Sequence, residues 1–215
     1  MTWSEVFELL TGGLQETVWM VGVSALLTAV GGLLVGVLLV LTDAGRLRPL
    51  NVVLGAIVNV GRSLPFIILL VAVIPFTRAV VGTTIGTDAA IVPLTIGAIP
   101  FFARIVESAL REVPPDVVAA ATAMGATRRQ IVGKVLLREA LPALVAGLTI
   151  TVIALVGYSA MAGVVGGGGL GDLAIRYGYQ RFETEVMIAT VVALVVFVQL
   201  VQMVGDFLVR RLSHR

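Results

Sequence analysis

The sequence predicts an all-α, polytopic membrane protein with five transmembrane helices. Of its 215 residues, 58% are hydrophobic and 13% are charged, whereas a soluble domain carries about 25% charged residues. The mean hydropathy is +1.06, and several uncharged runs reach the about 20 residues that a helix needs to cross a bilayer. A chain with so few charges lacks the polar surface that water requires, so we expect its helices to pack in lipid.

Five apolar segments are predicted to be the spans. They are, in order, 17–42, 51–76, 89–103, one within 140–171, and 186–205. The third is short, and helix can extend beyond it into the sequence RIVESAL. The second is interrupted by Arg62. The predicted organisation is an external interfacial segment (1–16, with Trp3 and Phe7 as headgroup anchors), a transmembrane domain (17–205) and a basic tail (206–215).

The positions of the basic residues predict the orientation. Most of the 15 Lys and Arg residues lie in the first connection, in the third connection and in the C-terminal tail. Because segments rich in Lys and Arg stay inside the cell, these three segments are expected to be cytoplasmic. The N-terminus is then outside and the C-terminus inside.

Composition excludes several classes of function. The chain has no Cys, and its only His is His214, so neither thiol chemistry nor a His-based metal site is expected. The net charge of +2 is too small to indicate nucleic-acid binding. The stretch GVVGGGGLG lacks the Lys and the Ser or Thr of a phosphate-binding loop. We therefore expect no cofactor in this chain and no catalytic activity of its own.

The loop after the third span has the sequence pattern of short helices and not of a flexible linker. Pro114 and Pro115 stop the third helix, Asp116 is a candidate N-cap for a short alanine-rich helix, and Gly125 can close that helix in the left-handed conformation. The spacing predicts a shared face for Val117, Ala121 and Met124. A second helix, starting at a Thr127–Gln130 capping box, leads back to the membrane. On pattern alone, packing against the chain's own spans is favoured over a docking role.

The loop resembles the cytoplasmic loop of permease subunits of type I ATP-binding-cassette (ABC) importers, which reads E-A-A, three residues, G, nine residues, I-x-L-P. Ala120, Ala121, Gly125 and Leu137 occupy matching places, and the departures are Ala119 for Glu, Val135 for Ile and Arg138 for Pro. Three further stretches resemble the methionine-importer branch. They are RSLPFIILLVAVIPFTRAVVGTTIG, LVGYSAMAGVVGGGGLG and RYGYQRFETEVM.

The resemblance implies an ABC permease domain over residues 17–205, in a multi-pass protein of the bacterial cell membrane. It implies two permease copies, two separate ATPase subunits that hold ATP and Mg, and an external binding protein or lipoprotein that delivers L- or D-methionine. The loop at about 111–139 would carry the coupling helix that docks on the ATPase. The implied docking residues are Asp116, Val117, Val118, Ala119, Ala120, Ala121, Met124, Gly125 and Arg128.

Other residues are candidates for the pathway or a hinge. Arg62 lies before Pro65 inside the second span, where a charge must face protein or water; a structural arginine bound by carbonyl groups is the other interpretation. Tyr158, Ser159 and Met161 either line the pathway or pack between helices. The rival functions are a permease for another small amino acid or related solute, and an ion-coupled secondary transporter. The uncharged cores hold no carboxylate, which disfavours proton coupling but leaves a sodium-coupled carrier open.

Overall fold

The computed structural model describes residues 3–43 and 45–213, and the regular structure in these residues is entirely helical. The long helices are α1 (Trp3–Thr42), α2 (Arg48–Ser63), α5 (Thr87–Arg111), α9 (Leu141–Gly163) and α11 (Thr184–Leu212). The short helices are η1 (Gly45–Leu47), α3 (Phe66–Ala72), α4 (Ile74–Val81), α6 (Pro115–Ala123), α7 (Arg128–Gln130), η2 (Ile131–Leu136), α8 (Leu137–Glu139), α10 (Gly169–Leu173) and η3 (Ala174–Tyr179). In the described residues, four helices are long and apolar enough to cross a membrane, and a bent pair supplies a fifth crossing. The all-α, five-span prediction is confirmed.

Helix α1 is longer than predicted. Its 40 residues correspond to about 60 Å, twice the thickness of a bilayer core. The chain has no structural break at residue 16, because residues 3–16 form the first turns of α1. This stretch contains no proline, and Gly13 is needed for packing, since a Cβ there would lie 2.5 Å from the Leu173 side chain. Residues 1–2 and 214–215 of the predicted terminal segments lie outside the described residues.

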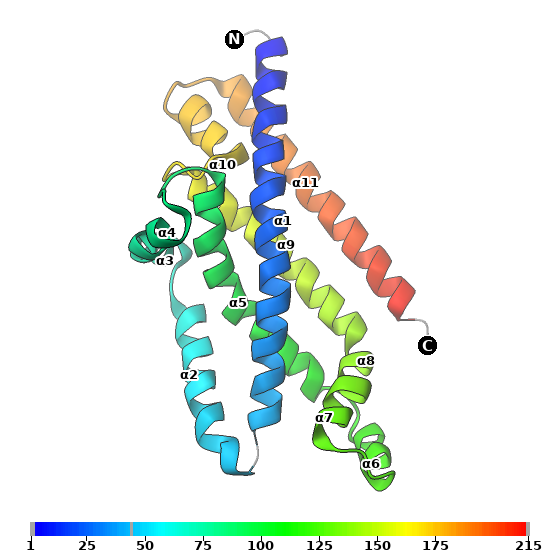
Figure 1. The fold of residues 1–215 in the computed structure, drawn as a ribbon. Helices are drawn as coiled ribbons and strands as arrows, with labels where there is room; N and C mark the ends of the chain where they lie inside the picture. Colours follow the sequence, from blue (N-terminus) through cyan, green and yellow to red (C-terminus); the bar gives the residue numbers. More distant parts are fainter. Residues whose placement is uncertain (1–2, 44, 214–215) are drawn as a thin grey trace.

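Small residues let α1 pack along α5. Thr28, Gly32 and Gly36 are buried on one side of α1. A Cβ on Gly32 would lie 2.8 Å from the Phe102 ring, and one on Gly36 would lie 2.6 Å from Val106. Close approach through small residues is the usual way that helices associate in lipid. Figure 1 shows the long helix α1 crossing α5 and α9 in the middle of the bundle.

The second span, predicted for 51–76, is not one straight helix. The segment Gly45–Ser63 and helix α3 meet at an angle of 106°. Pro65 causes the break, because proline has no N–H to donate and forces the preceding residue out of the helical conformation; Leu64 is extended. Helices α3 and α4 then lie beside the outer half of α5 (Figure 1).

The helix of the third span is longer than the uncharged run 89–103. Helix α5 has 25 residues and runs through both Pro93 and Pro100 to Arg111, so the expected extension into RIVESAL is confirmed. Pro100 packs against Gly61 of α2, where a Cβ would lie 2.7 Å from the proline ring. This contact joins the last turn of α2 to the middle of α5.

The glycine-rich stretch after the fourth span is a tight turn, as expected for a segment that needs close contact. Gly166, Gly168 and Gly169 have φ between +75° and +82°, a conformation that glycine adopts without steric cost. The turn folds α10 back onto α9, where a Cβ on Gly163 would lie 2.3 Å from the Asp172 nitrogen. Figure 1 shows η1 and α6 to α8 at the opposite end of the molecule from this turn, as the predicted orientation requires.

We predict that Gly36→Ala destabilises the protein by about 1–3 kcal/mol, because the added methyl group overpacks the α1–α5 contact. Thermal unfolding of the purified protein in detergent measures the effect. Gly22→Ala is the matched control, since no atom lies within 4 Å of a Cβ placed there. Equal unfolding temperatures for the two variants would contradict close packing between α1 and α5.

Candidate functional site

Helix α6 stands between two backbone breaks. It follows extended Pro114, which occupies the N-cap position, and no side chain caps it. The prediction that Asp116 is the cap is wrong; Asp116 lies in the first turn, where its charge still favours the helix dipole. Gly125 has φ +80°, which confirms the left-handed ending. The Thr127–Gln130 capping box is also confirmed, with both of its hydrogen bonds present.

The side chains of α6 that are buried and exposed differ from the prediction. Ala121 is only 5% exposed, whereas Met124 is 83% exposed, so the residues expected on one face do not share one environment. At 100° per residue, Ala121 lies 60° from both Val118 and Met124, and Met124 follows the last residue of α6. Val118 packs against the cluster that contains Val132 and Leu136. The exposed face of α6 is therefore Val117, Ala120 and Met124, with Ala119 exposed beside it.

Arg128 attaches the segment after α6 to the membrane bundle. Its Nη2 donates a hydrogen bond to the carbonyl oxygen of Val40, at 3.0 Å, in the last turn of α1. The sequence suggested acidic groups on a partner for this side chain, but the structure shows an acceptor within the same chain. Apolar packing thus holds α6 itself, and Arg128 ties the segment that follows it to α1.

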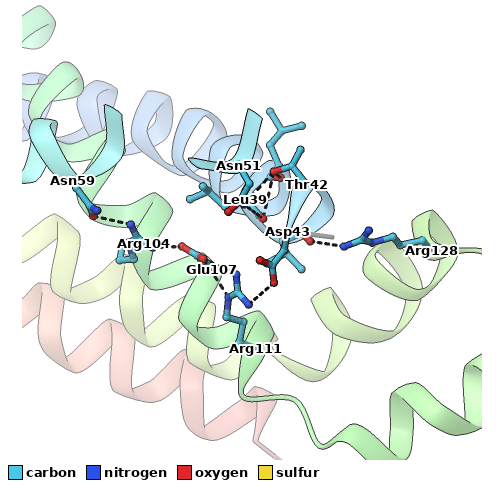
Figure 2. A network of polar contacts seen from close by, with 11 residues as sticks. Leu39, Thr42, Asp43, Asn51, Asn59, Arg104, Glu107, Arg111 and Arg128 are labelled. Atoms are coloured by element: carbon cyan, nitrogen blue, oxygen red, sulfur yellow. Dashed lines mark hydrogen bonds and ion pairs between the residues drawn. The ribbon is translucent and has the colours of Figure 1, made fainter. Parts of the chain in front are cut away.

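A network of polar contacts surrounds this attachment point (Figure 2). Glu107, which is 6% exposed, accepts hydrogen bonds from Arg104 at 2.5 Å and from two nitrogens of Arg111 at 2.9 and 3.1 Å. Arg111 also donates to Asp43 at 2.8 Å, and Arg104 donates to Asn59 at 2.7 Å. One buried carboxylate therefore links α5 to the end of α1 and to α2.

A second set of contacts closes the network. Asn51 at the start of α2 donates to the Leu39 carbonyl oxygen at 2.6 Å and to the Thr42 hydroxyl at 3.2 Å. Figure 2 shows these contacts beside Asp43 and Arg128. The elements α1, α2, α5 and the loop after α6 therefore meet at this network.

The network was not predicted, although one signal was present. Arg104, Glu107 and Arg111 lie three and four residues apart, the spacing at which charged side chains meet on a helix. The contributions of Asp43, Asn51 and Asn59 depend on which helices are neighbours, and one sequence does not show that.

The pKa of Asp43 is lowered from its ordinary value, mainly by its hydrogen bond with Arg111 and then by the charges of Arg111, Arg128 and Arg48. Because the folded protein holds this carboxylate ionised, the contact contributes stability above the ordinary Asp pKa of about 3.9. That contribution is lost only as the pH falls through the lowered value. The link from α1 to α5 is therefore intact at neutral pH.

The structure does not bring the predicted pathway residues together. Ser159 is buried and bonds to the Val156 carbonyl oxygen at 2.8 Å, and Tyr158 stacks on Phe66 with ring centroids 4.6 Å apart, so both pack between helices. Met161 is 48% exposed. Arg62 and Pro65 are exposed at the break in the second span.

An open cleft of about 950 Å³ lies at the other end of the molecule. The early turns of α1 and the α10–η3 segment line it, with Glu5, Glu8, Glu16, Asp172, Arg176, Tyr177 and Arg181 among its residues. Glu16 holds the glycine turn by accepting a hydrogen bond from the Gly169 nitrogen at 2.6 Å. The cleft is polar and charged, in contrast to the grooves between α9 and α11.

A helical membrane bundle with a short, anchored helix projecting beyond it defines the membrane subunit of an ABC-type importer. The chain belongs to the family described as the binding-protein-dependent transport system inner membrane component, which matches residues 32–215. Members of this family are non-catalytic transport permeases, and the chain is a multi-pass protein of the bacterial inner membrane.

Relatives and solved structures agree along the chain. It is 56% identical over 211 residues to the probable D-methionine transport system permease protein MetI of Vibrio cholerae, covering 97% of this chain and 94% of that protein. It is 44% identical over 181 residues to the methionine import system permease protein MetP of Bacillus subtilis, covering 83% and 82%. A chain of the inward-facing MetNI methionine ABC transporter matches with 52% identity, a TM-score of 0.94 and full coverage of both chains. A chain of an amino acid ABC transporter, 20% identical with a TM-score of 0.81 over 97% and 96% of the two chains, shares the fold.

We predict that Glu107→Gln destabilises the protein by about 1.5–3 kcal/mol, because it weakens the charge-assisted hydrogen bonds that the buried carboxylate accepts from Arg104 and Arg111. Thermal unfolding of the purified protein in detergent measures this loss. Glu112→Gln is the control on the same chain, since Glu112 is exposed and accepts a bond only from Ser108. If the two variants unfold at the same temperature, the buried carboxylate does not hold this end of the bundle together.

Proposed function

We propose that this chain is the membrane subunit of an ATP-driven methionine importer. Two copies form the pathway, two separate ATPase subunits bind and hydrolyse ATP with Mg, and an external binding protein supplies the solute. A permease for another small amino acid is the alternative. The similarity favours methionine, because relatives described as methionine permeases match most of the chain at 44–56% identity.

The observation that carries the proposal is the exposed apolar face of α6, formed by Val117, Ala120 and Met124. An exposed apolar face at the basic, non-lipid end of a membrane protein indicates a protein partner. Full burial of a Val or Met side chain contributes roughly 1.5–3 kcal/mol, whereas exposed ion pairs contribute about 0–1 kcal/mol. We therefore assign the docking energy to Val117 and Met124, and not to the arginines nearby.

The contacts that hold α6 in place support a mechanical role. Val118 and Ala121 fix it to the chain's own cluster, and Arg128 connects the next segment to Val40. A helix held in this way moves as a rigid body, whereas a flexible loop would absorb the displacement. Closure of two ATPases on nucleotide would move two such helices, and the network around Glu107 would carry the movement to α1, α2 and α5.

Proton-coupled transport is disfavoured by the small number of buried carboxylates. Glu107 is the only one in residues 3–43 and 45–213. Three hydrogen bonds from two arginines hold it, and these arginines contact Asp43 and Asn59 in turn. Glu107 therefore serves to connect helices, and the described residues offer no other buried carboxylate for proton coupling.

The charged outer cleft supports the proposed binding-protein contact. It lies at the predicted external end, and its Tyr177 ring lies under the Arg181 guanidinium at 4.6 Å. Tyr179 is 67% exposed nearby. Tyrosine and arginine side chains are enriched at protein interfaces.

We predict that Met124→Glu prevents the ATPase subunit from copurifying with this chain, because the variant places a charge at the centre of an apolar contact. The measurement is the amount of ATPase recovered from detergent extracts with the tagged permease. Leu50→Glu is the control, since Leu50 is exposed at the same end of the molecule but lies on α2. Undiminished recovery with Met124→Glu would argue against docking through α6.

We also predict that Gly125→Val lowers uptake of labelled methionine several-fold in a strain without other methionine importers, at an unchanged level in the membrane. A non-glycine residue at φ +80° costs at least about 1–2 kcal/mol, which shifts the end of α6. Gly133→Val is the matched control, because Gly133 has ordinary backbone angles and, like Gly125, open space around its Cβ position. Normal uptake by the Gly125 variant would contradict the assigned coupling role, and absence of uptake by the wild type would contradict the substrate.

A further inference from the structure

Arg62 is a charge at membrane depth that the chain itself does not neutralise. It lies about 21 Å along α2 from Arg48, at 1.5 Å per residue, in a hydrocarbon core of about 30 Å. Its side chain is exposed, and it makes no hydrogen bond or ion pair with the residues that the structure describes. Since a charge at this depth is not stable against lipid, Arg62 faces water or a group that does not belong to this chain.

Arg62 is the innermost member of a polar side of α2. At 100° per residue, Asn51, Asn59 and Arg62 fall within about 80° of one another around the helix. Asn59 bonds to Arg104 of α5, whose side chain remains 31% exposed. Polar groups that are partly exposed at membrane depth line a hydrated space. This side of α2 therefore connects the basic end of the bundle with the middle of the membrane.

The three arginines near this surface differ in one respect. Arg104 and Arg111 are neutralised by Glu107, and Arg111 also by Asp43. Arg62 has no such partner among the described residues, so it is the place on this surface where a positive charge is left uncompensated. A guanidinium group in that state is suited to a carboxylate, which it binds through paired N–H groups.

We infer that the polar side of α2 lines the hydrated route through the permease and that Arg62 receives the carboxylate of the amino acid in transit. The inference rests on the proposed function, because it requires an amino-acid solute. A zwitterion that crosses the membrane needs a countercharge for its carboxylate at mid-depth. A single exposed arginine provides this countercharge. The solute can leave again, since no second group of the described chain closes around the solute.

The first test uses the absence of cysteine from the natural chain. Arg62→Cys and Val60→Cys are each prepared in the complete transporter with its ATPase subunits, in inside-out vesicles. A charged, membrane-impermeant methanethiosulfonate is the probe. Val60 is the matched control, because it is 62% exposed at nearly the same depth but lies about 160° away around the helix.

The position-62 cysteine should react with the probe, and excess methionine should slow the reaction at least fivefold. The position-60 cysteine should react at least tenfold more slowly and should not respond to methionine. Equal reactivity at the two positions, no reaction at position 62, or no protection by methionine would overturn the inference.

The second test separates charge from folding. Arg62→Gln should lower methionine uptake at least tenfold, while Arg62→Lys, which keeps the charge but not the paired N–H groups, should retain more uptake than Arg62→Gln at equal membrane levels. Wild-type uptake tests the proposed function, and the ratio of variant to wild type tests the role of Arg62. Normal uptake by Arg62→Gln beside an active wild type overturns this inference alone, whereas an inactive wild type overturns the proposed function and the inference with it.

Discussion

The structure depends most on one buried carboxylate, Glu107, held between two arginines near the end of α5. Burial of an ion is costly, and only close hydrogen bonds make it stable. Here two bonds come from Arg111 and one from Arg104, and each arginine continues to another element. The two arginines that bind Glu107 also contact Asp43, next to the end of α1, and Asn59 on α2. One carboxylate therefore helps to position three helices.

This arrangement supports the proposed action of so small a helix on the whole bundle. Helix α6 has nine residues and buries little on its own chain. The next segment fixes its position instead, through the capping box at Thr127, the hydrogen bond of Arg128 and the apolar residues of η2. The rigid part is thus α6 together with the segment through Ala140, and it meets the spans where the Glu107 network joins them.

The sequence predicts local features well here because their causes are local. Pro65 breaks the helix because proline has no N–H to donate. Gly125 adopts a positive φ because other residues are sterically strained in that conformation. Thr127 and Gln130 form a capping box within a single turn. What the sequence does not show are mainly contacts between distant segments. Which residues of α6 are buried depends on η2, and the first turns of α1 pack against the turn at Gly169. One sequence shows the residues of such contacts but not their pairing.

The arginines show how the same residue type serves two purposes in one membrane protein. Arg104 and Arg111 have carboxylate partners within the chain, so their charge is used to hold helices together. Arg62 lies near the end of α2, close to Pro65, where the chain turns through 106° and supplies no carboxylate. A charge kept at mid-membrane without a partner costs stability, and folding alone gives no reason to retain it there. The requirement that it meets is therefore one of transport, which is why the unpaired arginine, and not the paired ones, marks the route of the solute.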